Sequence, residues 1–483
     1  MKWNAPIFLL LAAIFPGCGK KAEKKGDSNP PGAFDIRLLD SYSTNRTPKI
    51  AWTTSVGAGS FDVVIGKDKA CANSVQEATK ILTTEWTPAA ALDQGQYYIC
   101  VISYGLGGST AATNSGLSLE IDAWDATAVA DSDSIPGRAR AESAGVWTGN
   151  EILMWGGKIG TDSFSNSGAI LNLTTGLWTA LPLQSVLSAR SGHTAVWTGT
   201  KMLIFGGIDS AGPSASGAVF EPAAAAWSAI ATPDPDEFVP RSDHTAVWTG
   251  SEMLIFGGHR GAGGLPSSAK YNLETNVWTT LVASPLEGRI GHTATWTGKE
   301  MVIWGGSNAR NDDLKFFGDG AAYNPATNQW RSLSKTNSPS ERSHHSAVWT
   351  GSLLLVWGGV NAAGQTLATG YSYDPSTDTW KELPATNAPS VARHTAVWAN
   401  SQMVLMGGIG NGKGGLQPSP PCTYRLEQNS WHCLAASDLG ANVSITERVT
   451  HLAIWATDRL VVMGGSSDKD VFTPISDTWV IKP

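Results

Sequence analysis

Six histidines recur at one position of a repeated segment, such as RSDHTAVWTGSEMLIFGG at residues 241–258. A ring of imidazoles could bind a metal ion or an anion. A residue that returns in nearly every repeat is better explained by a need that every repeat shares, such as pairing buried backbone groups. We therefore assign to the scaffold His193, His244, His292, His345, His394 and His451, with the arginines Arg140, Arg190, Arg241, Arg289, Arg342 and Arg448.

Two repeats depart from this pattern. The first has Ser143 in place of the histidine, and the sixth has Val391 in place of the arginine, with Arg393 displaced by two residues. No other catalytic signature accompanies the repeats, because the chain lacks a nucleophile elbow, a P-loop, an HExxH motif and a Rossmann fingerprint. The sequence therefore predicts no cofactor and no catalytic residue.

The cysteines favour disulfides over a metal site. Apart from Cys18, the chain has Cys71, Cys100, Cys422 and Cys433, an even number divided between two parts of the sequence. None of them lies in a CxxC pair or near a histidine at zinc spacing, so no metal site is expected. Two disulfides are the economical pairing, and they indicate an oxidising compartment.

The N-terminus indicates export. Lys2 precedes the apolar run 7–15, which is too short to cross a bilayer but suits the hydrophobic region of a signal peptide. Gly17-Cys18 at its end resembles the lipobox of bacterial lipoproteins, although Phe15-Pro16 departs from the usual residues. The resemblance implies a signal peptide at 1–17 and lipidation of Cys18 in the cell envelope, with the outer membrane as the expected site. An ordinary signal peptide with an incidental cysteine is the alternative.

Seven repeated segments follow one another between residues 140 and 465, and each ends in two glycines. Each unit predicts four short strands, two in the HTAVW and MLIFGG runs and two around a later Tyr-to-Trp stretch. At a strand end that approaches a neighbouring unit, a side chain in place of glycine would clash. The twin glycines are Gly156, Gly157, Gly206, Gly207, Gly257, Gly258, Gly305, Gly306, Gly358, Gly359, Gly407, Gly408, Gly464 and Gly465.

The period near 50 residues, the Gly-Gly pair and the aromatic pair resemble the kelch repeat, which builds β-propellers. The resemblance covers residues 123–483 and implies an all-β fold with seven blades. The last unit stops before its fourth strand, whereas a strand around Trp124 precedes the first unit. We expect this N-terminal strand to complete the last blade and close the ring.

Loop lengths predict a working face. The spacing from the first-strand tryptophan to Gly-Gly is nine residues in every repeat, whereas the second-to-third strand and blade-to-blade connections vary. In an up-and-down blade these two variable classes of loop share one face, which is the candidate ligand surface. The candidate binding residues there are Arg310, Asp312, Asp313, Phe316, Phe317, His259 and Arg260.

Each of these candidates has a structural alternative. The two phenylalanines of 307–320 suit contact with a protein or a carbohydrate if they are exposed, but they can instead fold the loop onto its own blade. His259-Arg260 could face an acidic ligand or could simply be solvated. The acidic segment 232–240 reads as a rigid connector, because it lacks the spacing of a calcium-binding loop.

The segment 34–122 predicts a second β domain. Short alternating strands, Leu92, Gly95 and Tyr98 at tyrosine-corner spacing, and Cys100 two residues later resemble a fibronectin type III or immunoglobulin-like sandwich. Residues 18–33 form a polar, Lys-rich and Pro-containing stretch, which predicts a tether. In the propeller, Cys422 and Cys433 flank an aromatic pair and are expected to face each other across a hairpin.

Composition narrows the function. A net charge of −7 with only 16% charged residues argues against a basic nucleic-acid binder and against disorder. Kelch-like propellers serve as binding platforms and, less often, as enzymes, so the fold does not settle function. We expect a monomeric, membrane-anchored protein that binds a glycan or a protein partner. A carbohydrate-active enzyme resembling sugar mutarotases, with its site at the channel mouth, is the alternative; a galactose oxidase-like copper site is disfavoured.

Overall fold

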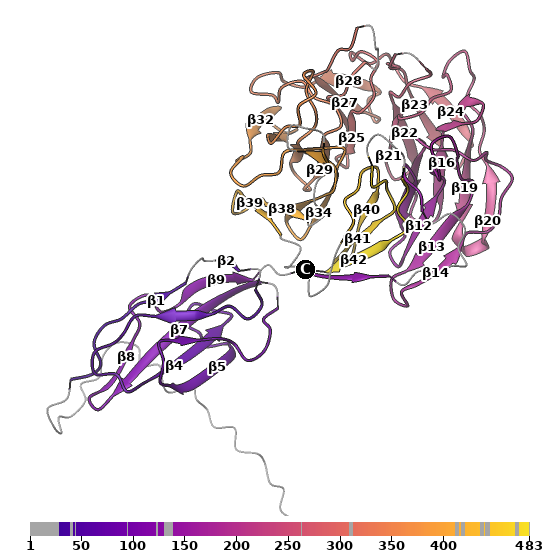
Figure 1. Ribbon diagram of the computed structural model, residues 1–483. Coiled ribbons are helices and arrows are strands. Elements are labelled where there is room, and N and C mark those ends of the chain that lie inside the picture. The colour runs from indigo at the N-terminus through magenta and orange to yellow at the C-terminus, as the bar shows by residue number, and fades with distance from the viewer. Residues whose placement is uncertain are drawn as a thin grey trace, which may run out of the picture. The chain divides into compact units, whose positions relative to one another are not determined.

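The computed structural model describes most of the chain (Figure 1). The described residues are 29–38, 42–43, 45–93, 95–121, 124–129, 139–261, 263–308, 313–410, 415–416, 421–434, 439, 445–468 and 473–482. The predicted signal peptide, Cys18, Arg310 and Asp312 lie outside them. The chain divides into two compact units, one running to Trp124 and one from Asp125 to Lys482.

The N-terminal unit contains two sheets that pack around one core. Alternate residues of the longer strands are buried, as expected when one face of a sheet covers a core. One sheet has the order β1 (Ile36–Arg37), β3 (Ile50–Trp52) and β6 (Glu85–Trp86). The other has the order β2 (Tyr42–Ser43), β9 (Leu117–Ile121), β7 (Gly95–Gly105), β4 (Ser60–Gly66) and β5 (Ser74–Ile81), with β8 (Gly108–Ala111) paired to β7.

The tyrosine that pins this unit is not the predicted one. Tyr97 is buried, and its hydroxyl donates to the carbonyl of Asp93 at 2.9 Å. Tyr98 lies on the opposite side of β7, where its hydroxyl contacts Gln96. The prediction based on Tyr98 is therefore wrong by one residue, because successive side chains of a strand point to opposite faces.

In its described residues, the C-terminal unit forms seven four-stranded antiparallel sheets, which confirms the predicted all-β propeller. Each of the first six blades uses consecutive strands. The first three blades are β11 (Ala144–Trp147), β12 (Glu151–Trp155), β13 (Gly168–Asn172) and β14 (Leu177–Ala180); β15 (Thr194–Trp197), β16 (Met202–Phe205), β19 (Gly217–Glu221) and β20 (Ala226–Ala229); and β21 (Thr245–Trp248), β22 (Glu252–Phe256), β23 (Ser268–Asn272) and β24 (Val277–Thr280).

The next three blades repeat this order. They are β25 (Thr293–Trp296), β26 (Met301–Trp304), β27 (Gly320–Asn324) and β28 (Gln329–Ser332); β29 (Ser346–Trp349), β30 (Leu354–Trp357), β31 (Gly370–Asp374) and β32 (Thr379–Glu382); and β34 (Thr395–Ala399), β35 (Gln402–Met406), β38 (Cys422–Arg425) and β39 (Ser430–Cys433). Short elements decorate the connections: η1 (Pro222–Ala224), β17 (Ile208–Asp209), β18 (Gly212–Pro213), β33 (Val391–Ala392), β36 (Ile409–Gly410) and β37 (Gly415–Leu416).

The seventh blade closes the ring as predicted. It joins β40 (Leu452–Ala456), β41 (Arg459–Met463) and β42 (Thr478–Lys482) to β10 (Asp125–Ala128) from the start of the unit. The pairing of β10 with β42 runs from Asp125 opposite Lys482 to Ala128 opposite Trp479. The first strands of successive blades contact one another around the whole ring, including β11 with β40.

The Gly-Gly pairs join neighbouring blades. In all seven blades the N–H of the second glycine donates to a carbonyl of the next blade's first segment, at 2.8–3.0 Å. The first glycine makes room for the next blade, since a Cβ on Gly257 would lie 2.5 Å from Cε1 of His292. Its positive φ of 72° also favours glycine. The repeat is thus explained by contacts between blades.

The outer tryptophans also connect blades. The indole N–H groups of Trp227, Trp278, Trp330 and Trp380 donate to a carbonyl of the preceding connection, as in Trp278 to Ala231 at 2.7 Å and Trp380 to Ser334 at 3.0 Å. Because the cores lie between adjacent sheets, these rings bury apolar surface and pair their polar atom at the same time.

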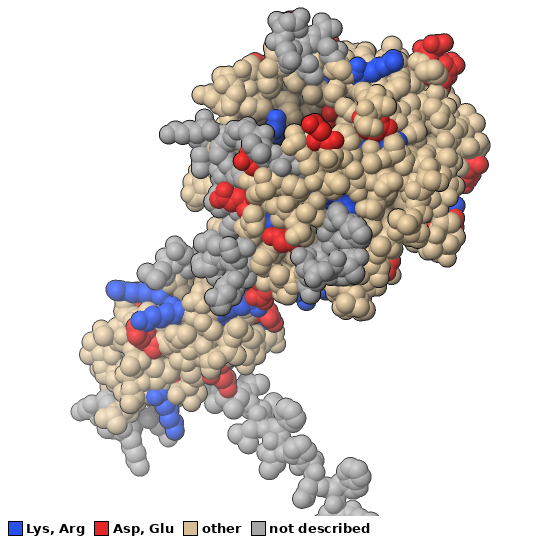
Figure 2. Space-filling model, turned by 45° about the vertical axis from the view of Figure 1, so that its right-hand side comes forward, with Lys and Arg blue, Asp and Glu red and all other residues tan. Residues whose placement is uncertain are grey.

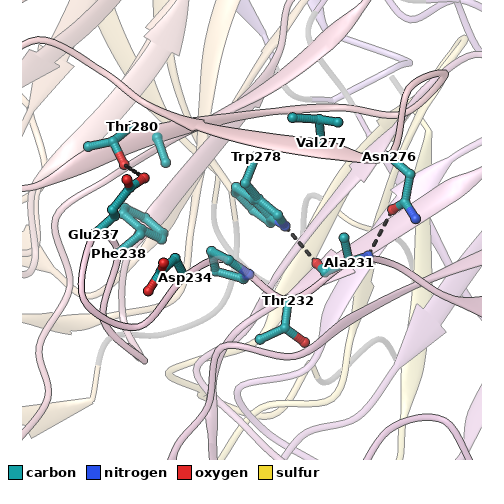
Figure 3. Close-up of a pocket in the computed structure, with 11 residues that line it drawn as sticks. Ala231, Thr232, Asp234, Glu237, Phe238, Asn276, Val277, Trp278 and Thr280 are labelled. Carbon is teal, nitrogen blue, oxygen red and sulfur yellow. Dashed lines mark hydrogen bonds between the residues drawn. The ribbon is translucent and has the colours of Figure 1, made fainter.

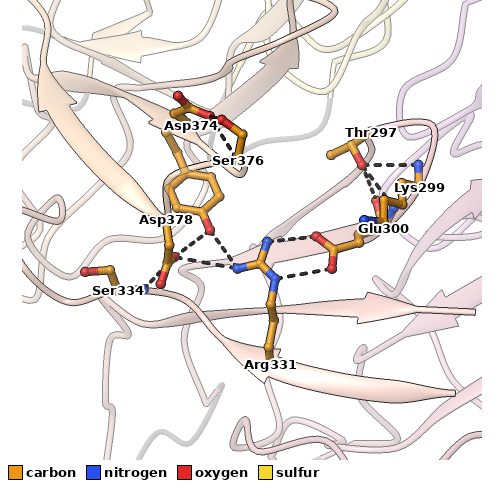
Figure 4. A network of polar contacts seen from close by, with 9 residues as sticks. Thr297, Lys299, Glu300, Arg331, Ser334, Asp374, Ser376 and Asp378 are labelled. Atoms are coloured by element: carbon orange, nitrogen blue, oxygen red, sulfur yellow. Dashed lines mark hydrogen bonds and ion pairs between the residues drawn. The ribbon is translucent and has the colours of Figure 1, made fainter. Parts of the chain in front are cut away.

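One polar network is specific to the fourth and fifth blades (Figure 4). The Arg331 guanidinium donates to both carboxylate oxygens of Glu300 at 3.2 and 2.7 Å and to the hydroxyl of Tyr373 at 2.9 Å. Tyr373 in turn donates to Asp378 at 2.6 Å. The hydrogen bonds to Glu300 raise the pKa of Arg331. This network fixes two outer strands to each other and leaves the channel untouched.

Two disulfides are present, Cys71–Cys100 and Cys422–Cys433. Cys422 and Cys433 are directly opposite each other on β38 and β39. The first bridge lies within the N-terminal unit and the second within the sixth blade, so neither links the two units.

Candidate functional site

The repeated arginines are structural. Arg241 is fully buried, and its Nη1 donates to the carbonyls of Gly257 and Ser267 at 2.8 and 3.0 Å. The first-glycine carbonyl is bound in the same way in each repeat that has the arginine, namely by Arg140, Arg190, Arg241, Arg289, Arg342 and Arg448. These side chains satisfy strand-end carbonyls and do not reach a ligand.

The repeated histidines are also committed to contacts between blades. The Nε2 atoms of His244 and His292 lie 2.9 Å from the threonine hydroxyls of the preceding blade, and His193 contacts the carbonyl of Trp155. Burial lowers the pKa to about 3 for His193, His292, His394 and His451, and in the same direction for His244 and His345. These imidazoles are neutral at pH 7 and form the wall of the channel.

A cavity of about 570 Å³ opens at the end of the channel where the first strands begin. All seven repeats contribute to its lining. The residue just before each histidine position forms its rim, and the rim residues are Glu142, Gly192, Asp243, Gly291, His344, Arg393 and Thr450. This mouth is on the face of the variable loops, because the Gly-Gly strand ends and the blade-to-blade connections meet there.

Every rim residue has a left-handed backbone, with φ between 52° and 61°. Hydrogen bonds around the rim impose this conformation: the N–H of Asp243 donates to Gly192 at 2.9 Å, and that of His344 donates to Gly291 at 2.8 Å. Glycine adopts this conformation without strain, whereas other residues incur a cost of about 1–2 kcal/mol. Only two of the seven blades use glycine here.

Five rim side chains are thus kept against a backbone preference. Glu142, Asp243, His344, Arg393 and Thr450 differ in chemistry from one repeat to the next, unlike the scaffold residues beside them. Thr450 is β-branched, which makes its φ of 52° a marked outlier. Strain of this kind concentrates at functional sites.

We expect Thr450→Gly to leave the free energy of unfolding unchanged or to raise it by up to about 1 kcal/mol, since relief of strain outweighs the added entropy of the unfolded chain. The matched change in the opposite direction, Gly192→Ala, should lower it by about 1–2 kcal/mol. Urea titration of both variants measures the two effects. A clear loss of stability in Thr450→Gly would contradict the strain argument.

The charged rim residues differ in their partners. Glu142 accepts hydrogen bonds from Lys158 at 3.1 Å and Ser191 at 2.9 Å. Asp243 pairs with His259 at 2.9 Å, which raises the pKa of that imidazole. Arg393 is exposed, and its guanidinium pairs with no carboxylate among the described residues.

His344 stands beside Arg393 on the rim. Its Nδ1 lies 2.9 Å from the hydroxyl of Ser343, and its carbonyl accepts the N–H of Arg393 at 3.0 Å. Burial and the neighbouring guanidinium lower the pKa of His344 to about 4. The rim therefore presents a neutral imidazole next to an exposed guanidinium.

Two protein-family models match the chain. The KLHDC2/KLHL20/DRC7 Kelch-repeats domain matches residues 291–483, and the Attractin/LZTR1 beta-propeller matches residues 169–370. Both models describe propeller domains, and the first describes kelch repeats, in agreement with the seven-bladed β-propeller described above. A search of curated proteins found no match.

The described residues of the predicted ligand loop, 307–320, are only partly exposed. Phe317 is 3% exposed, and its ring lies beneath the Arg289 guanidinium at 4.2 Å. For Phe317 the structural alternative is therefore confirmed, because its ring packs within the propeller and helps to cover a buried cation. Phe316 is half-buried, whereas Asp313 is exposed. Lys315 forms an ion pair with Glu287.

The second candidate pair lies beside the mouth. His259 directly follows the third Gly-Gly pair, and its Nε2 contacts Asp243 on the rim. Arg260 next to it is exposed. Sequence reasoning selected His259 but missed its partner Asp243 and the rest of the rim. Variation at one position inside a nearly invariant repeat was the signal that could have identified them.

The acidic connector 232–240 folds against the outer strand of the third blade (Figure 3). A cavity of about 260 Å³ is lined by Asp234 and Glu237 of the connector and by Trp278, and the Phe238 ring stacks on Trp278 at 5.9 Å between ring centres. The carbonyl of Asp234 accepts the N–H of Phe238 at 2.8 Å, and Phe238 is buried. Among the described residues, no group of three or more His, Cys, Asp or Glu side chains is placed to hold a metal ion.

Proposed function

We propose that this protein is an exported lipoprotein of the cell envelope whose kelch-type propeller binds a partner through the variable-loop face, with the channel mouth at the centre. The family matches support a protein-interaction platform. The two disulfides support an oxidising compartment. A protein partner is the first candidate, and a glycan is the other macromolecule that this face could bind.

The strained rim carries the proposal. A scaffold that needed only to close its channel could use glycine at all seven positions, as it does at Gly192 and Gly291. The exposed guanidinium of Arg393 favours an acidic group on the partner, because a planar cation pairs well with a carboxylate. On the face shown in Figure 2, acidic and basic side chains are sparse and interspersed, which gives no support to nucleic-acid binding.

A pull-down from envelope extract and a glycan array, both with the mature full-length protein, identify the partner. The rim variant Arg393→Gly/Thr450→Gly should lose the partner while remaining folded. Lys299→Ala is the matched control, because Lys299 is exposed in the turn between first and second strands, on the opposite face. Equal recovery with both variants would contradict the assignment of the mouth.

The cavity also favours a second candidate, the carbohydrate-active enzyme. Glu142, His344 and Arg393 line one cavity, and an imidazole and a carboxylate are groups that transfer protons. Incubating the protein with each sugar found on the array and following anomeric exchange by NMR tests this activity. Exchange that is no faster than the spontaneous rate would leave binding as the function.

The anchor has its own test. Cys18→Ala should move the protein from the membrane fraction to the soluble fraction, because lipidation is what holds it. Retention in the membrane fraction would contradict the lipoprotein proposal. Among the described residues, no helix is both long enough and apolar enough to cross a bilayer.

A further inference from the structure

Three loops of the N-terminal unit end in aliphatic side chains that contact almost nothing. Leu106 is 100% exposed, Val56 is 85% exposed and Leu82 is 82% exposed. Single exposed aliphatic residues are common on protein surfaces. What sets these three apart is that they occupy the tips of three different loops and share one end of the unit.

The sheet register places the loops together. Phe61 of β4 is opposite both Ile81 of β5 and Ser103 of β7. Leu82 directly follows Ile81. The turn that carries Leu106 comes just after Ser103, at the end of β7. Val56 lies in the turn just before β4, where the N–H of Gly59 donates to the carbonyl of Tyr104 at 2.7 Å.

The chain enters the unit at this same end. The N–H of Gly32 donates to the carbonyl of Val56 at 2.8 Å, and the hydroxyl of Thr110 donates to the carbonyl of Pro31 at 2.6 Å. It leaves at the other end, because Ile121 is opposite Gly95, the first residue of β7. Since β7 has 11 residues, its ends are roughly 33 Å apart.

We propose that the loop tips at Val56, Leu82 and Leu106 insert into the surface of the membrane that anchors Cys18. The inference rests on the proposed lipid anchor. Eleven residues, 19–29, separate Cys18 from Pro30, which limits their span to about 40 Å and holds this end near the bilayer.

The charge of the connecting segment fits the same surface. Residues 19–29 contain four lysines against one glutamate and one aspartate. Basic residues near a bilayer are attracted to anionic lipids, and apolar side chains beside them enter the headgroup region. Insertion of the tips would hold the N-terminal unit upright, with its propeller-connected end away from the lipid.

The test places an environment-sensitive fluorophore at single cysteines in the lipidated, full-length protein. Vesicles of phosphatidylethanolamine and phosphatidylglycerol carry a lipid-borne quencher. Probes at Val56→Cys and Leu106→Cys should show about twofold or greater quenching. The matched control is Val75→Cys, since Val75 is 45% exposed near the other end of the same sheet, and its probe should show none.

A second measurement uses the soluble Cys18→Ala chain. Adding Val56→Ser, Leu82→Ser and Leu106→Ser should lower its affinity for the same vesicles about tenfold, without changing its melting temperature. Equal quenching at residues 56, 75 and 106 in an anchored protein would overturn the insertion proposal alone. Membrane retention of Cys18→Ala would instead overturn the anchor. A third outcome is that the probes are shielded from water but are not quenched by the lipid-borne quencher. This would indicate contact with a second copy of the protein and would contradict insertion.

Discussion

Lowering the pH from about 7 to about 5 is expected to unfold the propeller. Four buried histidines have a pKa of about 3 in the folded protein, against about 6.5 in an unfolded chain. At pH 5 each of them therefore removes about 2 kcal/mol of stability. Together they remove about 8 kcal/mol, which is comparable to the whole stability of an ordinary domain.

The direction in which the free energy of unfolding changes with pH follows from proton binding. Between pH 6.5 and about 3 the unfolded chain binds protons at these sites and the folded chain does not, so the free energy of unfolding falls as the pH falls. The contribution is fully present above pH 6.5. His244 and His345 shift in the same direction. All nine histidines lie after residue 190, so the N-terminal unit should not share the effect.

Urea unfolding followed by tryptophan fluorescence at several pH values measures this slope. His394→Gln is the informative variant, because it removes one buried imidazole that contacts Ser346 at 2.8 Å. Its slope between pH 6 and 5 should be smaller by about 1.2 kcal/mol per pH unit. A free energy of unfolding that stays constant from pH 7 to 5 would show that the imidazoles are not buried as described.

Replacing a repeated arginine is expected to have the second largest effect. Arg241→Met should lower the free energy of unfolding by about 2–5 kcal/mol, because buried carbonyls lose their donors. The change removes the guanidinium donors of the Val239 and Gly257 carbonyls and leaves the Ser267 carbonyl with only the Gly257 N–H at 3.3 Å. It also removes the guanidinium that lies 3.5 Å from the ring centre of Phe238.

Arg260→Met provides the matched control, because Arg260 is exposed on the same face and belongs to the next connection. A change there should stay within about 0.5 kcal/mol. Thermal and urea unfolding of both variants test the difference. If Arg241→Met were as stable as Arg260→Met, the repeated arginine would have to be reassigned from scaffold to ligand binding.

The sequence predicted the scaffold well because the scaffold repeats. Contacts between blades recur at each junction, so the pattern of arginine, histidine, tryptophan and Gly-Gly revealed both the strands and their number. Closure by β10 followed from an incomplete last unit and an orphan strand before the first unit.

The binding site was harder to predict, since a ligand contacts residues that differ between repeats. The rim residues occupy a position whose geometry comes from backbone hydrogen bonds around the channel, and the residue types of Thr450 and Arg393 do not themselves indicate a left-handed conformation. For Phe317 the sequence left ligand contact and packing onto the blade open. The structure shows packing, because the ring covers the buried Arg289 guanidinium.

The most direct test of the account is the affinity of the identified partner for rim variants of the full-length protein. Arg393→Gly/Thr450→Gly should weaken binding at least about tenfold, the loss expected when a charged hydrogen-bonded pair is removed. Its stability should equal or exceed that of the wild type, and Lys299→Ala should bind normally. Unchanged affinity in the rim variant, or an equal loss in Lys299→Ala, would contradict the assignment of the channel mouth as the binding site.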